Sequence, residues 1–441
     1  MPRSPLHFSL QAKRTSDSPI TYFIEKALST PGLISFAAGL VDEPSLPVAE
    51  VQRAAEQLLS DPKAARAALQ YGSTQGLPSL REKILDLVCQ ADQVPAAAVN
   101  LNADDVLITT GSQQFLYLLG EALLDPGDIV ITEAPSYFVY HSALASHGVR
   151  VLTARMDEHG LDLDALAELL QRLQHSGDLR RVKLIYTVDY FQNPTGLTLS
   201  RERRPKLVEL ARRFSTEHRL LILEDAAYRE LRYGEKDLPS LKSFDAGNEF
   251  VVYTSTFSKP CAPGFRTGYA LCPRELMAPL CNLKSNHDFG SCNLAQHLLD
   301  RLLACGDYTR HTARLREVYR AKKTLMIAAL EQEFADWPEV RWTDPEGGFY
   351  IWLTFPPHVN AGPSGELVHR ALAEGVMYIP GEFAHIPDEF GGPPRNNEAR
   401  LCFAVADAEQ IREGVRRLRA ACRGLEALPR ARSAQSLPAY S

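Results

Sequence analysis

The sequence predicts an α/β protein with two domains: a large domain built on a mostly parallel sheet flanked by helices, and a smaller α+β domain. Two observations lead to this prediction. From about residue 105, short apolar runs alternate with helical segments, and such runs are typical of strands buried on both faces of a parallel sheet. After about residue 300, long charged helices and a few separate strands replace this alternation, which indicates a second domain.

The region before the alternation is expected to be mainly helical. Residues 1–18 are polar and are predicted to be loose. Pro47 opens an amphipathic helix, because apolar residues follow it at helical spacing. A loop follows at residues 71–76, and a second helix begins near Pro78. Because chain ends often lie close together, the N-terminal segment 1–45 is expected to join the small domain.

The large domain is predicted to span residues 46–300. A helix is expected over residues 112–124, directly after the first strand. The expected strands are short apolar runs at residues 106–108, 129–131, 150–152, 182–188, 220–223, 250–253 and 268–271.

The small C-terminal domain is predicted to span residues 301–424. Residues 308–334 form one or two long helices, and residues 347–352 and 400–403 form strands. Residues 425–441 are predicted to be a disordered tail.

Composition excludes several classes of protein. The 441 residues carry a formal net charge of −6 and no long basic run, so no nucleic-acid partner is expected. No apolar stretch approaches the roughly 18 residues of a membrane helix. The eight cysteines form no C-x-x-C pair and do not cluster with histidines, which favours free thiols and no metal site. The first residues lack the apolar segment of a secretory signal, so a cytoplasmic protein is expected, although three basic residues and no acid among the first fourteen would also fit a short organelle transit segment.

Two turns at the ends of predicted strands could bind a ligand. Residues 110–114 (Thr-Gly-Ser-Gln-Gln) lead from a strand into a helix, and the free N–H groups of a helix N-terminus suit a phosphate. An ordinary helix cap at Ser112 explains the same residues. Residues 193–196 (Asn-Pro-Thr-Gly) follow another strand, where α/β proteins bind ligands, although this is also common turn chemistry.

Two further segments carry charged groups. Glu224 and Asp225 end an apolar strand, and burying an acid there without a partner is costly, so a cationic partner is expected. Lys259 also follows a strand, is preceded by the hydroxyls of Thr256 and Ser258, and is followed by Arg266. This pattern is that of a nucleophile beside an anion site, although a solvated lysine would also fit it.

Together and in this order, the four segments resemble the fold-type I enzymes that use pyridoxal 5′-phosphate (PLP), specifically the class I and II aminotransferases. The resemblance covers residues 19–424. The spacing Lys-x4-Gly-x-Arg-x-Gly from Lys259, and the opening residues 33–40 (Leu-Ile-Ser-Phe-Ala-Ala-Gly-Leu), are similar to the branch of 2-aminoadipate and kynurenine aminotransferases. The resemblance to this family implies a sheet of the seven-stranded type and a homodimer with shared active sites.

The resemblance implies a role for each catalytic residue. Lys259 holds PLP as an imine and, once released, moves the substrate proton. Asp225 pairs with the pyridinium nitrogen, so that the ring can act as an electron sink. Tyr228 and Asn193 bind the phenolic oxygen of the cofactor. Tyr137 stacks on the ring.

Other residues are implied to bind phosphate and substrate. Tyr71 reaches the phosphate of the partner subunit's cofactor. Arg400 binds the substrate α-carboxylate as a bidentate fork, and Gly39 and Asn193 lie beside the substrate. The phosphate is held within one chain by Ser112, Gln113, Thr256, Ser258 and Arg266.

Three departures from the family pattern bear on the site. Thr256 stands where serine is usual, but the hydroxyl is kept. Pro260 follows Lys259 directly, removes an N–H group and fixes φ beside the imine. Residues 286–292, where partner-subunit contacts are expected, match no pattern of the branch. The last two leave the substrate open.

The leading hypothesis is transamination: an L-amino acid gives its amino group to PLP, and a 2-oxo acid such as 2-oxoglutarate takes it from pyridoxamine phosphate. The same scaffold supports β-lyases, racemases and amino-acid tailoring enzymes, so these stay open. Gene regulators that use the fold as a ligand sensor carry a DNA-binding domain before it, whereas only ~110 residues precede Gly111 here and the fold uses them. A binding protein without catalysis is disfavoured by the Lys259 and Asp225 pair. The amino donor is not identified by the sequence.

Overall fold

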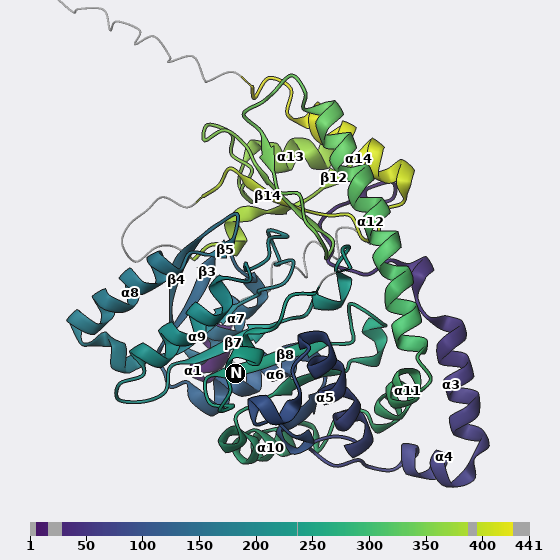
Figure 1. Cartoon of the computed structure of the whole chain (residues 1–441). Helices are drawn as coiled ribbons and strands as arrows, with labels where there is room; N and C mark the ends of the chain where they lie inside the picture. The colour runs from purple at the N-terminus through teal and green to yellow at the C-terminus, as the bar shows by residue number, and fades with distance from the viewer. Residues whose placement is uncertain (1–5, 16–28, 236, 387–394, 427–441) are drawn as a thin grey trace, which may run out of the picture.

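The computed structural model describes residues 6–15, 29–235, 237–386 and 395–426. Figure 1 shows a large lobe of sheet and helices, and a smaller lobe that contains α13, α14, β12 and β14. The helix α12 (Asp307–Glu333) runs from the smaller lobe along the side of the larger one. Among the described residues, no helix is long and apolar enough to cross a membrane.

The large sheet has the order β2-β9-β8-β7-β6-β3-β4-β5. The pairs β4–β3, β3–β6, β6–β7 and β7–β8 are parallel, whereas β9 is antiparallel to both β8 and β2. The seven predicted strands and the mostly parallel sheet are confirmed, and the two-residue β5 adds an edge hairpin. The strands are β2 (Val106–Thr109), β3 (Ile129–Ala134), β4 (Arg150–Asp157), β5 (Gly160–Leu161), β6 (Val182–Thr187), β7 (Leu221–Asp225), β8 (Val251–Thr256) and β9 (Gly268–Leu271).

Both faces of this sheet are buried, which explains why its strands are continuously apolar. In β3, Ile129 and Ile131 belong to one core cluster with leucines of the helix α8, whereas Val130 between them belongs to another cluster with leucines of α5 and α6. Successive side chains of a strand point to opposite faces, so a strand covered on both sides needs an apolar residue at every position. The helices of this lobe are α3 (Val48–Ser60), α4 (Pro62–Leu69), α5 (Pro78–Asp92), α6 (Gly111–Leu123), α7 (Phe138–His147), α8 (Leu163–Ser176), α9 (Arg203–Phe214), α10 (Arg274–Asp288) and α11 (Asn293–Ala304).

The smaller lobe holds an antiparallel sheet of order β10-β11-β14-β13. Residues 308–334 form the single helix α12, which packs on α14 and α11. The N-terminal strand β1 (Ile34–Ser35) pairs with β12 (Val376–Met377), so residues 34–35 pack against the C-terminal part of the chain. The remaining elements are β10 (Arg341–Trp342), β11 (Tyr350–Thr354), α13 (Glu366–Ala373), β13 (Ile379–Pro380), β14 (Glu398–Cys402) and α14 (Ala408–Ala421).

Two local predictions were wrong. Residues 10–14 of the segment expected to be loose form the helix α1 (Leu10–Arg14), capped by the Ser9 hydroxyl and packed against α7. The strand expected at residues 347–352 begins only at Tyr350: Gly348 has a φ of 68°, outside the strand region, and Gly347 forms an isolated bridge with Arg232 beside the ring of Phe191. Most of the predicted tail, residues 427–441, lies outside the described residues.

Candidate active site

Ten of the predicted site residues line one cavity of about 140 Å³ at the carboxyl ends of the large-sheet strands. The cavity lies where β2, β6, β7 and β8 end, the position at which open α/β sheets bind ligands. The ten are Ser112, Gln113, Tyr137, Asn193, Asp225, Tyr228, Thr256, Ser258, Lys259 and Arg266.

Lys259 lies in the turn that follows β8 and is mostly buried. Its Nζ donates to the carbonyl of Gly39 at 2.9 Å and lies 5.6 Å from the centre of the Phe349 ring. Burial lowers the pKa of Lys259 to about 8, and the nearby guanidinium groups of Arg400 and Arg266 act in the same direction. The amine is therefore available as a nucleophile near neutral pH, as a covalent link to a carbonyl requires.

Asp225 ends β7 and is buried. The hydroxyl of Tyr186 donates to its Oδ2 at 3.0 Å, and the N–H of Ala227 donates to its Oδ1 at 3.3 Å. Burial raises the pKa of Asp225 to about 6. Within the described ranges no Lys, Arg or His forms an ion pair with this carboxylate, so a cationic ligand group would complete it.

The neighbouring acid, Glu224, lies near a cationic side chain of the protein itself. Arg204 lies 3.8 Å from Glu224 and bonds to the carboxylate of Asp189, and all three side chains are fully buried. Glu224 also accepts from the N–H groups of Leu241 and Lys242 at 2.7 and 3.0 Å. Because successive strand residues face opposite sides, Glu224 is held in the interior while Asp225 faces the cavity.

The start of α6 forms a cradle for an anion. The cap residue is Thr110 and not Ser112, so the alternative of an ordinary cap at Ser112 does not hold. Thr110 makes no side-chain bond to the first turn, so the first N–H groups stay available. A Cβ atom at Gly111 would lie 2.9 Å from Nη2 of Arg266, so this guanidinium sits over the helix start. The Nη1 of Arg266 and the Oγ1 of Thr256 both donate to the Ser258 hydroxyl, at 3.4 and 3.0 Å. Free N–H groups, a guanidinium and hydroxyls at one point suit a phosphate.

Arg400, on β14 of the small sheet, does not line the cavity itself but bonds to Asn193, which does. Its Nη1 donates to Oδ1 of Asn193 at 2.8 Å, and its Nη2 donates to the carbonyl of Ala37 at 2.6 Å. The guanidinium is buried, and its Nε has no partner among the described residues. A buried guanidinium without a carboxylate partner calls for an anionic ligand.

Of the remaining predicted residues, Gly39 joins the site through its carbonyl, but Tyr71 does not lie near the cavity of its own chain. Tyr71 is 87% exposed, between α4 and α5. Asn293 holds this loop by donating from Nδ2 to the carbonyls of Ala67 and Gln70, at 2.8 and 3.0 Å. The expectation that Tyr71 acts on a partner subunit therefore stays a prediction.

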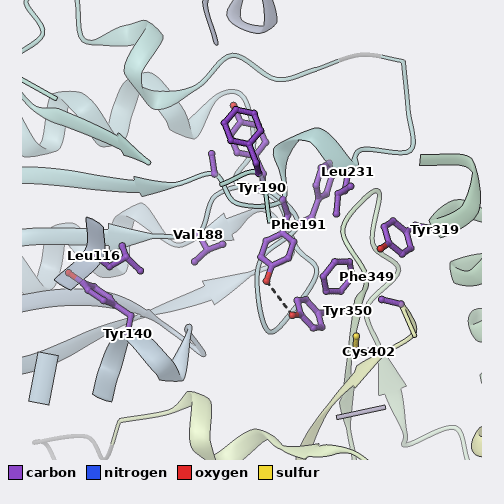
Figure 2. Packing of buried hydrophobic residues seen from close by; sticks show 14 of the residues in the cluster. Leu116, Tyr140, Val188, Tyr190, Phe191, Leu231, Tyr319, Phe349, Tyr350 and Cys402 are labelled. Carbon is purple, nitrogen blue, oxygen red and sulfur yellow. Dashed lines mark hydrogen bonds between the residues drawn. The ribbon is translucent and has the colours of Figure 1, made fainter. Parts of the chain in front are cut away.

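The sequence did not single out two tyrosines of the site. Tyr186 lies in β6 and bonds to Asp225, and Tyr350 lies in β11 with its hydroxyl 3.2 Å from that of Tyr228 (Figure 2). Both are fully buried. Both stand inside apolar strands, where a tyrosine has no signal that separates it from other core aromatics.

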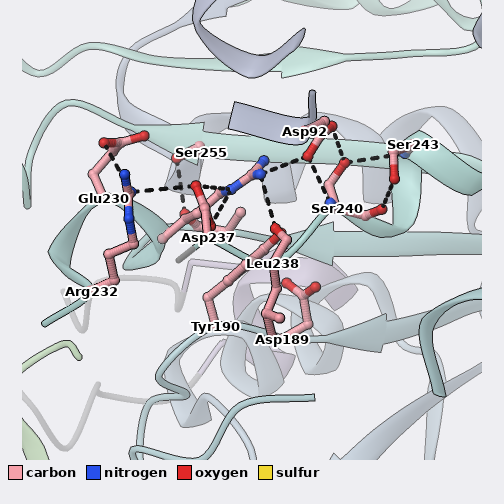
Figure 3. A network of polar contacts seen from close by, with 12 residues as sticks. Asp92, Asp189, Tyr190, Glu230, Arg232, Asp237, Leu238, Ser240, Ser243 and Ser255 are labelled. Carbon is pink, nitrogen blue, oxygen red and sulfur yellow. Dashed lines mark hydrogen bonds and ion pairs between the residues drawn. The ribbon is translucent and has the colours of Figure 1, made fainter. Parts of the chain in front are cut away.

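A buried polar network fixes the segment that carries Tyr228 (Figure 3). Arg229 donates from Nη2 to Asp92 at 2.6 Å and to the carbonyl of Leu238 at 3.0 Å, and from Nε to Asp237 at 3.3 Å. Ser240 donates its hydroxyl to the same Asp92 at 2.5 Å. These bonds link the turn after β7 to α5 and to residues 237–240, and so support the position of Tyr228 at the cavity.

Residues 31–418 match the family of class I and II aminotransferases. The chain belongs to this family. It is 37% identical to the 2-aminoadipate transaminase of Thermus thermophilus over 405 residues, which cover 91% of this chain and 93% of the relative. It is 33% identical to aromatic-amino-acid aminotransferase 1 of Thermococcus litoralis over 414 residues, covering 93% of each chain. The crystal structure of LysN, the α-aminoadipate aminotransferase of Thermus thermophilus, complexed with N-(5′-phosphopyridoxyl)-L-leucine, superimposes with a TM-score of 0.80 at 35% identity, covering 95% of this chain and 97% of that one.

The protein is accordingly a PLP-dependent aminotransferase, and its cavity fits that cofactor. Three groups there match the three parts of the cofactor that bind to a protein. The uncapped start of α6 beneath Arg266 suits the phosphate, Asp225 lacks a cation where a ring nitrogen would bind, and Lys259 has the lowered pKa that a link to the aldehyde requires.

Proposed function

We propose that this aminotransferase moves the amino group of an L-amino acid to a 2-oxo acid, with 2-oxoglutarate as the first candidate acceptor, in two half-reactions at one site. The observation that carries this proposal is Arg400, a buried guanidinium whose Nε lacks a partner among the described residues, beside the covalent lysine. Amino acids and 2-oxo acids share an α-carboxylate. A single anchor for that group means that the two substrates use the site in turn, which is a ping-pong order.

Lys259 has two tasks in this proposal. Bound PLP would supply a carbonyl that captures the amino group and a ring that withdraws electrons from the substrate Cα. Lys259 holds the cofactor covalently before the substrate arrives. Once displaced, its free amine removes the proton at Cα and returns it on the cofactor side, and burial assists by lowering the pKa of this amine to about 8, close to the working pH of an acid–base group.

The other side chains hold and polarise the cofactor. Asp225 keeps the ring nitrogen protonated by supplying the opposite charge in a buried place. Tyr228 and Asn193 bind the phenolic oxygen, and the 3.4 Å bond between them orients both. Tyr137 covers one face of the ring. The phosphate is assigned to Ser112, Gln113, Thr256, Ser258 and Arg266.

We further propose a homodimer in which Tyr71 completes the phosphate site of the partner subunit. Two exposed aromatic side chains support this interface: Tyr71 is 87% exposed and Phe289 is 72% exposed. Their loops touch, because the Thr74 hydroxyl donates to the carbonyl of Phe289 at 2.8 Å. Residues 286–292 thus form one surface with the Tyr71 loop. A two-fold contact would let each chain complete the other's site.

The domain limits and the location of the protein are also proposals. We assign residues 46–300 to a large cofactor-binding domain, and residues 1–45 with 301–424 to a small domain; the β1–β12 pairing supports this division. The free state of all eight cysteines supports a cytoplasmic location, since thiols stay reduced there.

A donor screen against 2-oxoglutarate tests the function. Each L-amino acid is first mixed with the purified PLP-loaded enzyme without an acceptor. We expect the true donor to give one equivalent of 2-oxo acid per site and to change the absorbance. Adding 2-oxoglutarate should then restore the original spectrum and yield glutamate. Lys259→Ala serves as the control without the covalent lysine. Product that forms only when both substrates are present together would contradict the two half-reactions.

A further inference from the structure

Tyr350 lies between the cofactor-binding and the substrate-binding groups of the site. It belongs to β11, its side chain is 1% exposed, and its hydroxyl lies 3.2 Å from the hydroxyl of Tyr228 (Figure 2). The guanidinium carbon of Arg400 lies 4.5 Å from the centre of its ring. Tyr350 therefore contacts the residue assigned to the cofactor's phenolic oxygen and the residue assigned to the substrate carboxylate.

We infer that Tyr350 is a positioning residue, whose hydroxyl donates to Tyr228 and so directs the Tyr228 proton onto the phenolic oxygen of the cofactor. The inference rests on the proposed role of Tyr228 and adds to it a second hydroxyl.

The direction of the hydrogen bond follows from counting protons. A tyrosine hydroxyl has one hydrogen and can accept through its oxygen. Either hydroxyl of the pair could donate to the other, and each is the only acceptor recorded for the other within the described chain. When Tyr228 donates to the phenolic oxygen of the cofactor, the Tyr350 hydrogen can only go to Tyr228, because a buried donor without an acceptor is costly. Donation from Tyr350 occupies a lone pair of Tyr228 and leaves the Tyr228 hydrogen free. The Asn193 amide, which donates to Tyr228 at 3.4 Å, acts in the same direction.

Three neighbours restrict the position of the Tyr350 hydroxyl. A Cβ atom at Gly39 would lie 2.5 Å from its oxygen. The Tyr228 ring meets the Tyr350 ring edge-on at 5.5 Å, and Arg400 covers a face. A hydroxyl fixed in this way polarises its acceptor, so the bond from Tyr228 onward is strengthened.

A stronger bond to the phenolic oxygen stabilises its anionic form. The neighbouring nitrogen of the Lys259 linkage then binds a proton less tightly, and removing the Tyr350 hydroxyl should reverse this effect. The other charged and titratable groups that face this linkage are unchanged by Tyr350→Phe. They are Arg400 and Cys402 on β14, Arg266 after β8, Asp225 on β7 and Tyr137 before α7.

The test is a pH titration of the visible absorbance of PLP-loaded protein. Tyr350→Phe should raise the midpoint of that titration by roughly half a pH unit, the effect of one weakened neutral bond. Tyr228→Phe should raise it further, and adding Tyr350→Phe to Tyr228→Phe should produce no additional shift, because Tyr350 acts through Tyr228. Tyr378→Phe is the matched control: Tyr378 is also fully buried and donates its hydroxyl to the carbonyl of Ala361 at 3.0 Å, away from the cavity.

Three outcomes overturn the inference, and they are distinguishable. A midpoint that Tyr350→Phe leaves unchanged removes the hydroxyl from the site's chemistry. An equal shift in the wild-type and Tyr228→Phe backgrounds means that Tyr350 acts by another route. A wild-type protein that takes up no PLP at Lys259 refutes the proposed function itself, and the inference with it.

Discussion

A Cβ atom added at Gly39 would lie 2.5 Å from the hydroxyl oxygen of Tyr350, whereas the next atom of that ring would lie 3.6 Å away. The carbonyl of the same glycine accepts from Lys259. The Tyr350 hydroxyl therefore occupies space that is free only because position 39 is a glycine.

This fit predicts that two substitutions compensate each other. Gly39→Ala should reduce kcat/KM about tenfold or more, because overpacking a closed site costs roughly 1–3 kcal/mol. In the Tyr350→Phe background the clashing oxygen is gone, so the same alanine should have little effect. Steady-state kinetics of the four proteins measure the coupling, and purely additive losses would contradict it.

Lys259 should bind the cofactor at a lower pH than an ordinary lysine. Only the neutral amine attacks a carbonyl, and burial lowers the pKa of Lys259 to about 8, so the rate of PLP uptake by cofactor-free protein should rise with pH and level off above about 8. An exposed lysine would level off only above about 10.4. Borohydride reduction and peptide mapping identify the labelled residue, and a label on another lysine would exclude Lys259.

Asp225 should destabilise the protein when no cofactor is bound. Its folded-state pKa is about 6 rather than the usual ~3.9, so keeping it ionised in the fold is unfavourable above pH 6, and the effect vanishes below about pH 4, where the carboxyl is protonated in both states. Asp225→Asn should thus increase the free energy of unfolding of the cofactor-free protein at pH 7 by up to about 2–3 kcal/mol. Urea denaturation at pH 4 and pH 7 measures this difference.

The PLP-loaded form provides the control for Asp225. There the carboxylate has its proposed cationic partner, so Asp225→Asn should lower stability instead, and should slow amino transfer on the order of 10³-fold. A substitution that stabilises both forms equally would contradict the pairing with the ring nitrogen.

Arg400 and Arg266 should separate substrate binding from cofactor binding. Arg400→Gln should weaken amino-acid binding by roughly 2–4 kcal/mol, the loss of a bidentate charged contact, with little change in PLP affinity. Arg266→Gln should show the opposite pattern. Fluorescence titration of PLP and spectral titration of the amino acid give both affinities, and a reversed result would mean that the two roles are exchanged.

Tyr71 should act on the partner subunit. Mixed dimers of Tyr71→Phe chains with Lys259→Ala chains contain one site that has both wild-type residues, so activity should recover. The matched control places both substitutions on one chain and mixes it with wild-type chains. In that dimer each site lacks one of the two residues if Tyr71 acts across the interface, whereas one site stays intact if it acts within its own chain.

The site residues that could be predicted from the sequence are those in short segments at the ends of predicted strands. Asp225 ends an apolar run that predicts a buried strand, and Lys259 and Asn193 lie in the turns after two more such runs. Parallel strands end at one edge of the sheet, so these residues are brought together, and Arg266 joins them just before β9. Tyr350 and Tyr186 could not be found in this way, because in the sequence a buried tyrosine in a strand looks like any other core residue.

The local details that the sequence did not predict also have physical reasons. Which of the two adjacent acids of β7 faces the cavity depends on the phase of the strand: Glu224 is held in the interior, 3.8 Å from Arg204, whereas Asp225 lines the cavity. Just before the late start of β11, Gly347 forms a bridge with Arg232 and lies against Phe191, and both residues are far from it in the sequence. Hydrophobic pattern and secondary-structure propensity depend on neighbouring residues and do not reveal such long-range contacts.

The 2.8 Å bond from Arg400 to Asn193 joins a strand of the small sheet to a loop of the large one. The same guanidinium is the proposed anchor of the substrate, so an arriving carboxylate must share or exchange this contact. Substrate affinity then depends on how the two lobes are arranged. A ligand that binds Arg400 better in one arrangement of the lobes raises the population of that arrangement. Variants selected for a new amino donor should therefore also carry changes along the seam between the lobes, at positions that never touch the donor.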